Sequence, residues 1–236
     1  MQPGIEQPQT MTTSADSEAR PSRSCVQCGR EFRAKQRAAP EHWECCANCL
    51  PLWATFCKMC PPLYRESDRA RLPCHASALA AVLDWQHGPE GLLLHGATGK
   101  GKTRAAWLLL RRLHFAGYRI EAFDCVSFSH EITRRFSADG DGVKWAAKLA
   151  RAPVLFLDDL GKGRLTERGV AELFGLVEVR TANLLPVIVT CNHVGDTLAA
   201  SLHGETGAAL VRRLREFCRC IYFGAPDTKR EKTCKR

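Results

Sequence analysis

The stretch GATGKGKT, from Gly96 to Thr103, constrains the fold of this chain more than any other feature. It matches the pattern G-x-x-x-x-G-K-[ST] in full, it follows the apolar run Leu92–Leu94, and a helical pattern begins directly after it. Glycines in such a turn let backbone N–H groups surround phosphate oxygens, because no Cβ stands in the way. The N-terminus of the helix adds partial positive charge. The stretch therefore predicts a phosphate-binding loop.

Two side chains of this loop have expected roles of their own. The Lys102 ammonium reaches the β and γ phosphates of a nucleotide, and the Thr103 hydroxyl is a ligand for Mg²⁺. A glycine-rich turn with an incidental lysine is the alternative, but it does not explain why a strand precedes the loop and a helix follows it. The expected nucleotide-binding residues are Gly96, Ala97, Thr98, Gly99, Lys100, Gly101, Lys102, Thr103 and Arg104.

A pair of carboxylates follows a second apolar run, in VLFLDDLG from Val154 to Gly161. In an open α/β sheet, ligands bind at the carboxyl ends of the strands. Asp158 is therefore expected to bind Mg²⁺ opposite Thr103, and Asp159 to orient or deprotonate the attacking water. The alternative is that these carboxylates cap the next helix.

Two more segments carry candidate residues. LPVIVTCN is a strand pattern that ends in Thr190 and Asn192, and the amide of Asn192 is suited to position water between a γ-phosphate and Asp159. ALVRRLREF contains Arg212, Arg213 and Arg215, and an arginine can neutralise charge on a transferring phosphoryl group across a subunit interface. From the residues alone, a solvated basic helix face is the simpler interpretation of these arginines.

Apolar patterns from residue 76 onward alternate between helix and strand. Such alternation indicates an α/β fold with a parallel sheet covered on both faces. The expected strands lie at residues 91–96, 118–124, 154–159, 185–192 and 218–223. The expected helices lie at residues 76–85, 102–117, 127–136, 143–150, 167–182 and 208–217.

Seven of the 13 cysteines lie between Cys25 and Cys60, which favours a metal site over disulfides in a chain without a recognisable export signal. Two C-x₂-C pairs are separated by 17 residues, a spacing typical of zinc sites. The favoured ligands are Cys25, Cys28, Cys46 and Cys49. The pair Cys57 and Cys60 can replace one half or join Cys45 or Cys74 in a second site, and Cys45 and His42 are further substitutes. Core packing is expected for Cys125, Cys191, Cys218 and Cys220.

Composition divides the chain into five parts. Residues 1–23 are expected to be a disordered tail, 24–60 the zinc-binding module, 61–75 a linker, 76–223 the nucleotide-binding core, and 224–236 a basic tail. A formal net charge of +9 favours a nucleic-acid partner as much as simple solubility. With no apolar run near the roughly 20 residues that cross a bilayer, we expect a cytoplasmic protein without a membrane partner.

Taken together, GATGKGKT, VLFLDDLGK, Arg180 after FGLVEV, LPVIVTCN and the RRLRE segment resemble the DnaC/IstB-like branch of AAA+ ATPases over about residues 61 to 223. PPLYRESD resembles the stretch of that family that lies near the adenine. The resemblance implies a five-stranded parallel sheet between helices, and it implies ATP hydrolysis with Lys102 and Thr103 in the first nucleotide motif. It also implies Asp158 as the organiser of Mg²⁺, Asp159 as the catalytic acid, Asn192 as sensor 1 and Arg213 as the arginine finger. The thirteen residues after the last strand are too few for a complete helical lid.

The leading functional interpretation implied by the resemblance is a helicase loader in DNA replication. Its expected partners are the replicative DNA helicase, single-stranded DNA and further copies of the chain, joined through the nucleotide interface. The zinc module is then a docking element, or a nucleic-acid contact that uses Arg30, Arg33, Lys35 and Arg37. One alternative is an ATPase helper of DNA transposition. Another is a zinc-stapled nucleic-acid-binding adaptor whose nucleotide site is structural.

Overall fold

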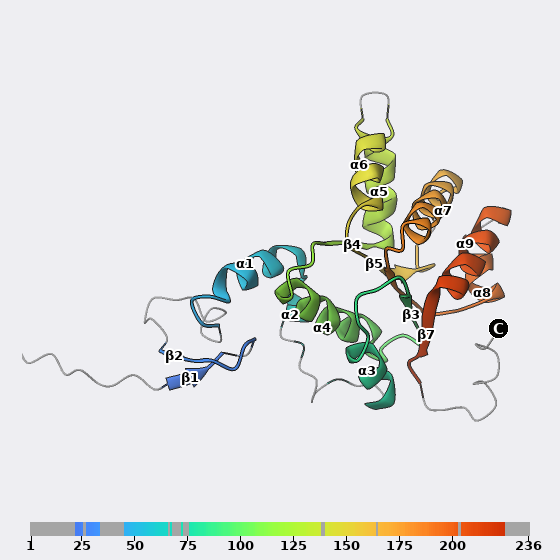
Figure 1. Ribbon diagram of the computed structural model, residues 1–236. Helices are drawn as coiled ribbons and strands as arrows, with labels where there is room; N and C mark the ends of the chain where they lie inside the picture. The colour runs from blue at the N-terminus through green and yellow to red at the C-terminus, as the bar shows by residue number, and fades with distance from the viewer. Residues whose placement is uncertain are drawn as a thin grey trace, which may run out of the picture. The chain divides into compact units, whose positions relative to one another are not determined.

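The computed structural model describes residues 22–25, 27–33, 45–65, 67, 72, 76–137, 140–163, 165–202 and 204–224. The chain forms two compact units that divide between Pro51 and Leu52 (Figure 1). The smaller unit contains the antiparallel strands β1 (Ser22–Ser24) and β2 (Glu31–Arg33). The expected tails lie mostly outside the described residues.

The larger unit is built on a five-stranded sheet in the order β4-β5-β6-β3-β7. All neighbouring strands are parallel, so their carboxyl ends lie at one edge of the sheet. This confirms the expected α/β fold. The strands are β3 (Gly91–His95), β4 (Ile120–Asp124), β5 (Val154–Leu160), β6 (Val187–Cys191) and β7 (Cys218–Tyr222).

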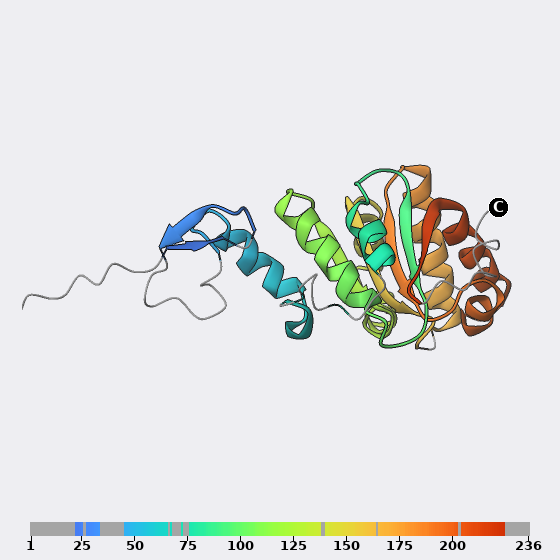
Figure 2. The ribbon, with the colours of Figure 1, turned by 90° about the horizontal axis from the view of Figure 1, so that it is seen from below.

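Helices cover both faces of this sheet, which is why its central strands are apolar on both sides. Figure 2 shows α3 (Ala76–Leu83) and α4 (Lys102–Phe115) on one face, and α7 (Glu167–Ala182) and α9 (Gly204–Phe217) on the other. On the α4 face, Trp107 meets Phe156 of β5 edge to face at 5.5 Å. Strand residues of the opposite face join the α7 and α9 core, namely Leu93, Leu155, Leu157, Val187 and Val189.

Three further helices contribute to that second core: α5 (Cys125–Arg135), α6 (Gly142–Ala150) and α8 (Asp196–Leu202). The sequence pattern does not predict α8, because its seven residues give too short a repeat; buried Leu198 and Leu202 hold it in place. Among the described residues, no helix is both long enough and apolar enough to cross a membrane.

Helices α1 (Leu50–Met59) and α2 (Pro62–Arg65) join the two parts of the chain. Phe56 of α1 is buried and meets Trp107 of α4 at 6.0 Å, while Arg65 of α2 donates to the carbonyls of Cys57 and Cys60 at the end of α1. Residues 52–60 therefore belong to the larger unit, whereas the cysteine spacing places them in the zinc module. The aromatic side chains of α1 account for this difference.

Arg180, near the end of α7, is a charged residue with no exposed surface. Its guanidinium donates to the carbonyls of Leu149 at 2.5 Å, Ala152 at 2.8 Å and Pro186 at 2.6 Å. Burial lowers the pKa of Arg180 to about 10, so the side chain keeps its charge at neutral pH. The residue joins the end of α6 to the start of β6 and is a structural element of the core.

Candidate nucleotide-binding site

The loop between β3 and α4 has the backbone of a phosphate cradle. Gly96, Gly99 and Gly101 have φ angles of 141°, 79° and 85°, which favour glycine. At Gly96 a Cβ would lie 2.5 Å from the carbonyl oxygen of Phe223, the residue that follows β7, so space as well as conformation requires glycine. At Gly99 a Cβ would meet nothing within 4 Å, so only the positive φ favours glycine there.

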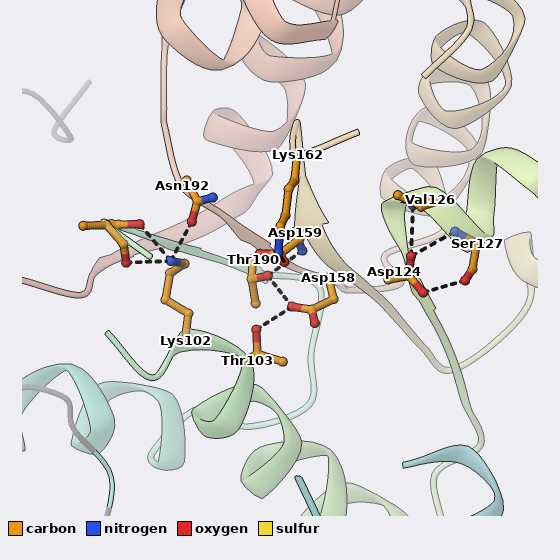
Figure 3. Close-up of polar contacts among 12 residues, drawn as sticks. Lys102, Thr103, Asp124, Val126, Ser127, Asp158, Asp159, Lys162, Thr190 and Asn192 are labelled. Carbon is orange, nitrogen blue, oxygen red and sulfur yellow. Dashed lines mark hydrogen bonds and ion pairs between the residues drawn. The ribbon is translucent and has the colours of Figure 1, made fainter. Parts of the chain in front are cut away.

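Lys102 opens α4, and its ammonium turns back into this loop. It donates to the carbonyls of Gly96 at 2.8 Å and Ala97 at 3.0 Å, and to Oδ1 of Asn192 at 3.0 Å (Figure 3). Burial lowers the pKa of Lys102, and the carboxylate of Asp159 opposes that shift. The structure thus brings together the residues that the first motif and the β6 end contribute.

Asp158 lies near the carboxyl end of β5, and two threonine hydroxyl groups contact its carboxylate. Its Oδ1 accepts from Oγ1 of Thr103 at 2.8 Å and from Oγ1 of Thr190 at 2.5 Å. Burial raises the pKa of Asp158, and both hydroxyl donors oppose the shift. A hydroxyl and a carboxylate side by side are oxygen ligands of the kind Mg²⁺ takes at nucleotide sites, so the residues present fit Mg-ATP.

Asp159 lies where the pairing of β5 with β6 is interrupted between Leu157 and Leu160. Its backbone has a φ of 55°, in the left-handed region that non-glycine residues seldom occupy, and its N–H donates to Oγ1 of Thr190 at 2.8 Å. Its Oδ2 forms an ion pair with Nζ of Lys162 at 2.7 Å. Lys162 ends the VLFLDDLGK segment, whose pattern indicates roles for the two aspartates but none for the lysine.

Comparison with known proteins agrees with this geometry. The family model described as IstB-like ATP binding protein matches residues 69–234. This chain belongs to the IstB-like ATP-binding protein family. The resemblance to the DnaC/IstB-like AAA+ branch is thereby confirmed. Among curated proteins, none is similar enough to the chain to count as a match.

Solved structures share the fold of this IstB-like protein. The crystal structure of the DnaC helicase loader is 22% identical, with a TM-score of 0.59 over 70% of this chain and 100% of that chain. A DnaI structure is 23% identical, with a TM-score of 0.51 over 63% and 79%. The structure of AMPPCP-bound DnaA from Aquifex aeolicus is 16% identical, with a TM-score of 0.55. The match covers 69% of this chain but only 50% of the DnaA chain.

Arg104, the last expected nucleotide-binding residue of the IstB-like loop, points its side chain toward α2. Its guanidinium donates to the carbonyl of Leu63 at 3.1 Å and lies 5.7 Å from the ring centre of Tyr64, which also stacks on Trp107 at 6.5 Å. Tyr64 belongs to the PPLYRESD stretch, which therefore packs against the first turns of α4. Only the backbone of Arg104 remains a candidate for phosphate contact.

Arg213 does not join the nucleotide cluster of its own chain. It lies on α9 and pairs with Oε2 of Glu178 on α7 at 3.0 Å and with Glu216 at 3.1 Å. Hydrogen bonding to Glu178 raises the pKa of Arg213 further. Its role as an arginine finger stays a prediction that concerns a second copy of this IstB-like protein.

Asp124 is a third carboxylate at this edge that the motifs did not reveal; it pairs in register with Asp158. Its Oδ1 accepts from the N–H groups of Val126 at 3.0 Å and Ser127 at 2.9 Å, and its Oδ2 from the Ser127 hydroxyl at 2.5 Å (Figure 3). Burial opposes these bonds, but together they lower the pKa of Asp124. The carboxylate caps α5.

The smaller unit holds a cluster of four thiols. The Sγ atoms of Cys25, Cys28, Cys46 and Cys49 all lie within 4.8 Å of one another. Burial opposes ionisation of Cys25, but N–H groups of Cys46, Cys28 and Gln27 outweigh it and lower the pKa of that thiol to about 6. Burial and the neighbouring thiols raise the pKa of Cys49. Four converging sulfurs are the donor set of a structural zinc site, so these residues fit zinc.

The alternative pair, Cys57 and Cys60, lies on and just after α1 in the larger unit. Cys60 is buried, and burial raises the pKa of its thiol to about 12. Among the described residues, the four cysteines of the smaller unit are the ones whose sulfurs converge, and this geometry favours them as the zinc ligands. Cys45 is buried outside the cluster, and His42 and Cys74 lie outside the described residues. Cys125, Cys191 and Cys218 are buried, as expected for core packing.

Proposed function

We propose that this IstB-like protein is a cytoplasmic, magnesium-dependent ATPase that acts as a helicase loader in DNA replication. One observation carries the proposal: at the carboxyl edge of the sheet, Lys102 bonds to Asn192 after β6, and the adjacent Thr103 bonds to Asp158 of β5. The adaptor alternative does not require such an arrangement, because a structural nucleotide needs no carboxylate pair beside the phosphates.

Each residue has a chemical task in this proposal. The loop N–H groups and Lys102 hold the β and γ phosphates, while Thr103 and Asp158 hold the metal. Magnesium would supply positive charge to the phosphates during hydrolysis. Asp159 accepts a proton from the attacking water, and Asn192 orients that water. Arg213 stabilises the phosphoryl group bound by a neighbouring copy, which makes self-association part of the cycle.

The choice of a helicase partner rests on likeness of fold and on charge. The DnaC helicase loader structure is matched over its whole length, and the net charge of +9 suits binding of single-stranded DNA. We assign the docking of the replicative helicase to the zinc module. The second candidate function is that of an ATPase helper of DNA transposition. It is favoured by the match of residues 69–234 to the IstB-like family model.

Turnover separates an ATPase from an adaptor. We expect the purified protein to bind and hydrolyse Mg-ATP, and Lys102→Ala to lose binding because the phosphate charge is no longer compensated. Asp159→Asn is expected to bind Mg-ATP but to hydrolyse it about 100-fold more slowly, the lower range for loss of a general base. Lys144→Ala, which removes an exposed lysine of α6, is the control and is expected to match the parent. Absence of turnover in the parent would support the adaptor.

The partner is tested separately. Full-length protein is mixed with the replicative helicase, or with a transposase, of the same source in ATP and in ADP. Complex formation is measured by analytical ultracentrifugation. A loader is expected to bind the helicase in a nucleotide-dependent manner, whereas binding of the transposase alone would identify the transposition helper.

A further inference from the structure

Lys162 contacts Asp159 but has no task in the proposed mechanism of ATP hydrolysis. Nζ of Lys162 lies 2.7 Å from Oδ2 of Asp159, the carboxylate proposed to take the proton from water. In Figure 3 the Lys162 side chain extends to Asp159, whereas the Lys102 ammonium is directed to Asn192 and the loop carbonyls. The two lysines thus contact different parts of the site, one the loop and one the proposed base.

A single turn creates this contact. The N–H of Lys162 donates to the carbonyl of Asp159 at 3.0 Å, and Gly161 between them has a φ of 85°. The left-handed backbone of Asp159 is held from its other side by Thr190, whose Oγ1 also donates to Asp158. The turn that aims the carboxylate therefore also supplies the ammonium that occupies one of its oxygens.

We propose that Lys162 is a positioning residue that restrains Asp159 and lowers the basal rate of ATP hydrolysis. This inference rests on the proposed function. While the pair is closed, Nζ of Lys162 occupies Oδ2 of Asp159, so this oxygen is not available to a water molecule. Oδ2 of Asp159 can contact water only while Lys162 is displaced.

Exposure of the pair limits how strong the restraint can be. The Lys162 side chain is 61% exposed and that of Asp159 is 28% exposed, so water competes for both partners. Ion pairs of this kind are closed only about two to five times as often as they are open. The pair is then open about one third to one sixth of the time, so Lys162 is expected to slow hydrolysis about three- to six-fold and to leave the affinity for Mg-ATP unchanged.

The test compares kcat and the Kd for Mg-ATP in the full-length protein. Lys162→Ala is expected to raise kcat about three- to six-fold with little change in Kd. Lys162→Arg keeps the pair and is expected to keep the parent kcat. Lys148→Ala is the matched control, because Lys148 forms an ion pair of similar length, 2.9 Å, and similar exposure, 54%, with Glu121 away from the loop.

The dependence of kcat on salt concentration is a second measurement, and a purely structural role of Lys162 would not change it. Exposed ion pairs are screened at about 1 M salt, where the Debye length is about 3 Å. The ratio of kcat between Lys162→Ala and the parent is therefore expected to fall toward one as salt rises. A parent-like or lower kcat in Lys162→Ala, or an equal increase in Lys148→Ala, would overturn the proposed role of Lys162. Neither result would affect the proposed ATPase function. Absence of turnover in every variant would overturn the proposed ATPase function as well.

Discussion

At the scale of single residues, burial of charge needs partners, and Arg180 shows which partners suffice. The two terminal nitrogens of its guanidinium donate to three carbonyls, two at or just after the end of α6 and one just before β6, and the side chain keeps its charge. Burial removes water from the guanidinium of Arg180 and thereby lowers its pKa. If the side chain were shortened, the carbonyls of Ala152 and Pro186 would lose this donor, whereas that of Leu149 would keep the backbone N–H of Ala152.

We expect Arg180→Met to reduce the free energy of unfolding by about 3 kcal/mol or more, because it leaves buried carbonyls unsatisfied. Urea unfolding monitored by circular dichroism measures the loss. Arg168→Met on the same helix is the control: that side chain is 57% exposed, and its pair with Glu172 at 3.8 Å is worth about 1 kcal/mol at most. Equal losses in the two variants would contradict the structural role of Arg180.

Local motifs predict the binding roles of Lys102, Thr103 and Asp158, because each motif is a short run of neighbouring residues that can be recognised in the sequence. The ion pair of Lys162 is different in kind. It depends on a positive φ at Asp159, and an aspartate in a sequence gives no sign of that conformation. The pairing of Arg213 with Glu178 is also hidden, since the two residues are 35 positions apart.

At the scale of elements, caps decide where helices begin. Asp124→Ala is expected to lower the free energy of unfolding by about 1 kcal/mol, because two N–H groups at the start of α5 lose their acceptor. Asp124→Asn keeps Oδ1 and is expected to lose less. Thermal unfolding at neutral pH compares the two variants, and equal losses would show that the cap is not the cause.

The pH dependence of this cap follows from the lowered pKa of Asp124. The charged cap stabilises the fold fully above the ordinary aspartate pKa of 3.8. Its contribution is lost as the pH falls through the lower pKa of the folded state. The difference in Tm between the parent and Asp124→Ala is therefore expected to shrink in acid.

Periodicity predicts the long elements and fails at the short ones. The five strands and the helices from α3 to α7 follow from apolar patterns, whereas α8 depends on a tertiary contact of Leu198 and Leu202. The residues of α1 carry a cysteine pattern and an aromatic pattern at the same time. Spacing of cysteines suggested the zinc module, but Trp53 and Phe56 pack into the larger unit.

At the scale of the whole molecule, the zinc and nucleotide residues belong to different compact units. We expect Cys25→Ser or Cys49→Ser to lose bound zinc while Mg-ATP binding persists. The double variant Cys57→Ser, Cys60→Ser is expected to keep one zinc per chain. Atomic emission measures the metal and a fluorescent nucleotide measures binding. Zinc loss in the Cys57, Cys60 variant would show that the ligand set has been assigned wrongly.

The strand order has a consequence for how this protein is made. β3 delivers the glycine loop, yet both of its neighbours come from much later in the chain, beginning at Val187 and Cys218. During synthesis, the backbone N–H and C=O groups of β3 stay unpaired until nearly the whole larger unit has been made. Acquisition of nucleotide affinity would thus mark the last stage of folding, and a nascent chain stalled before Cys218 would be a substrate for chaperones.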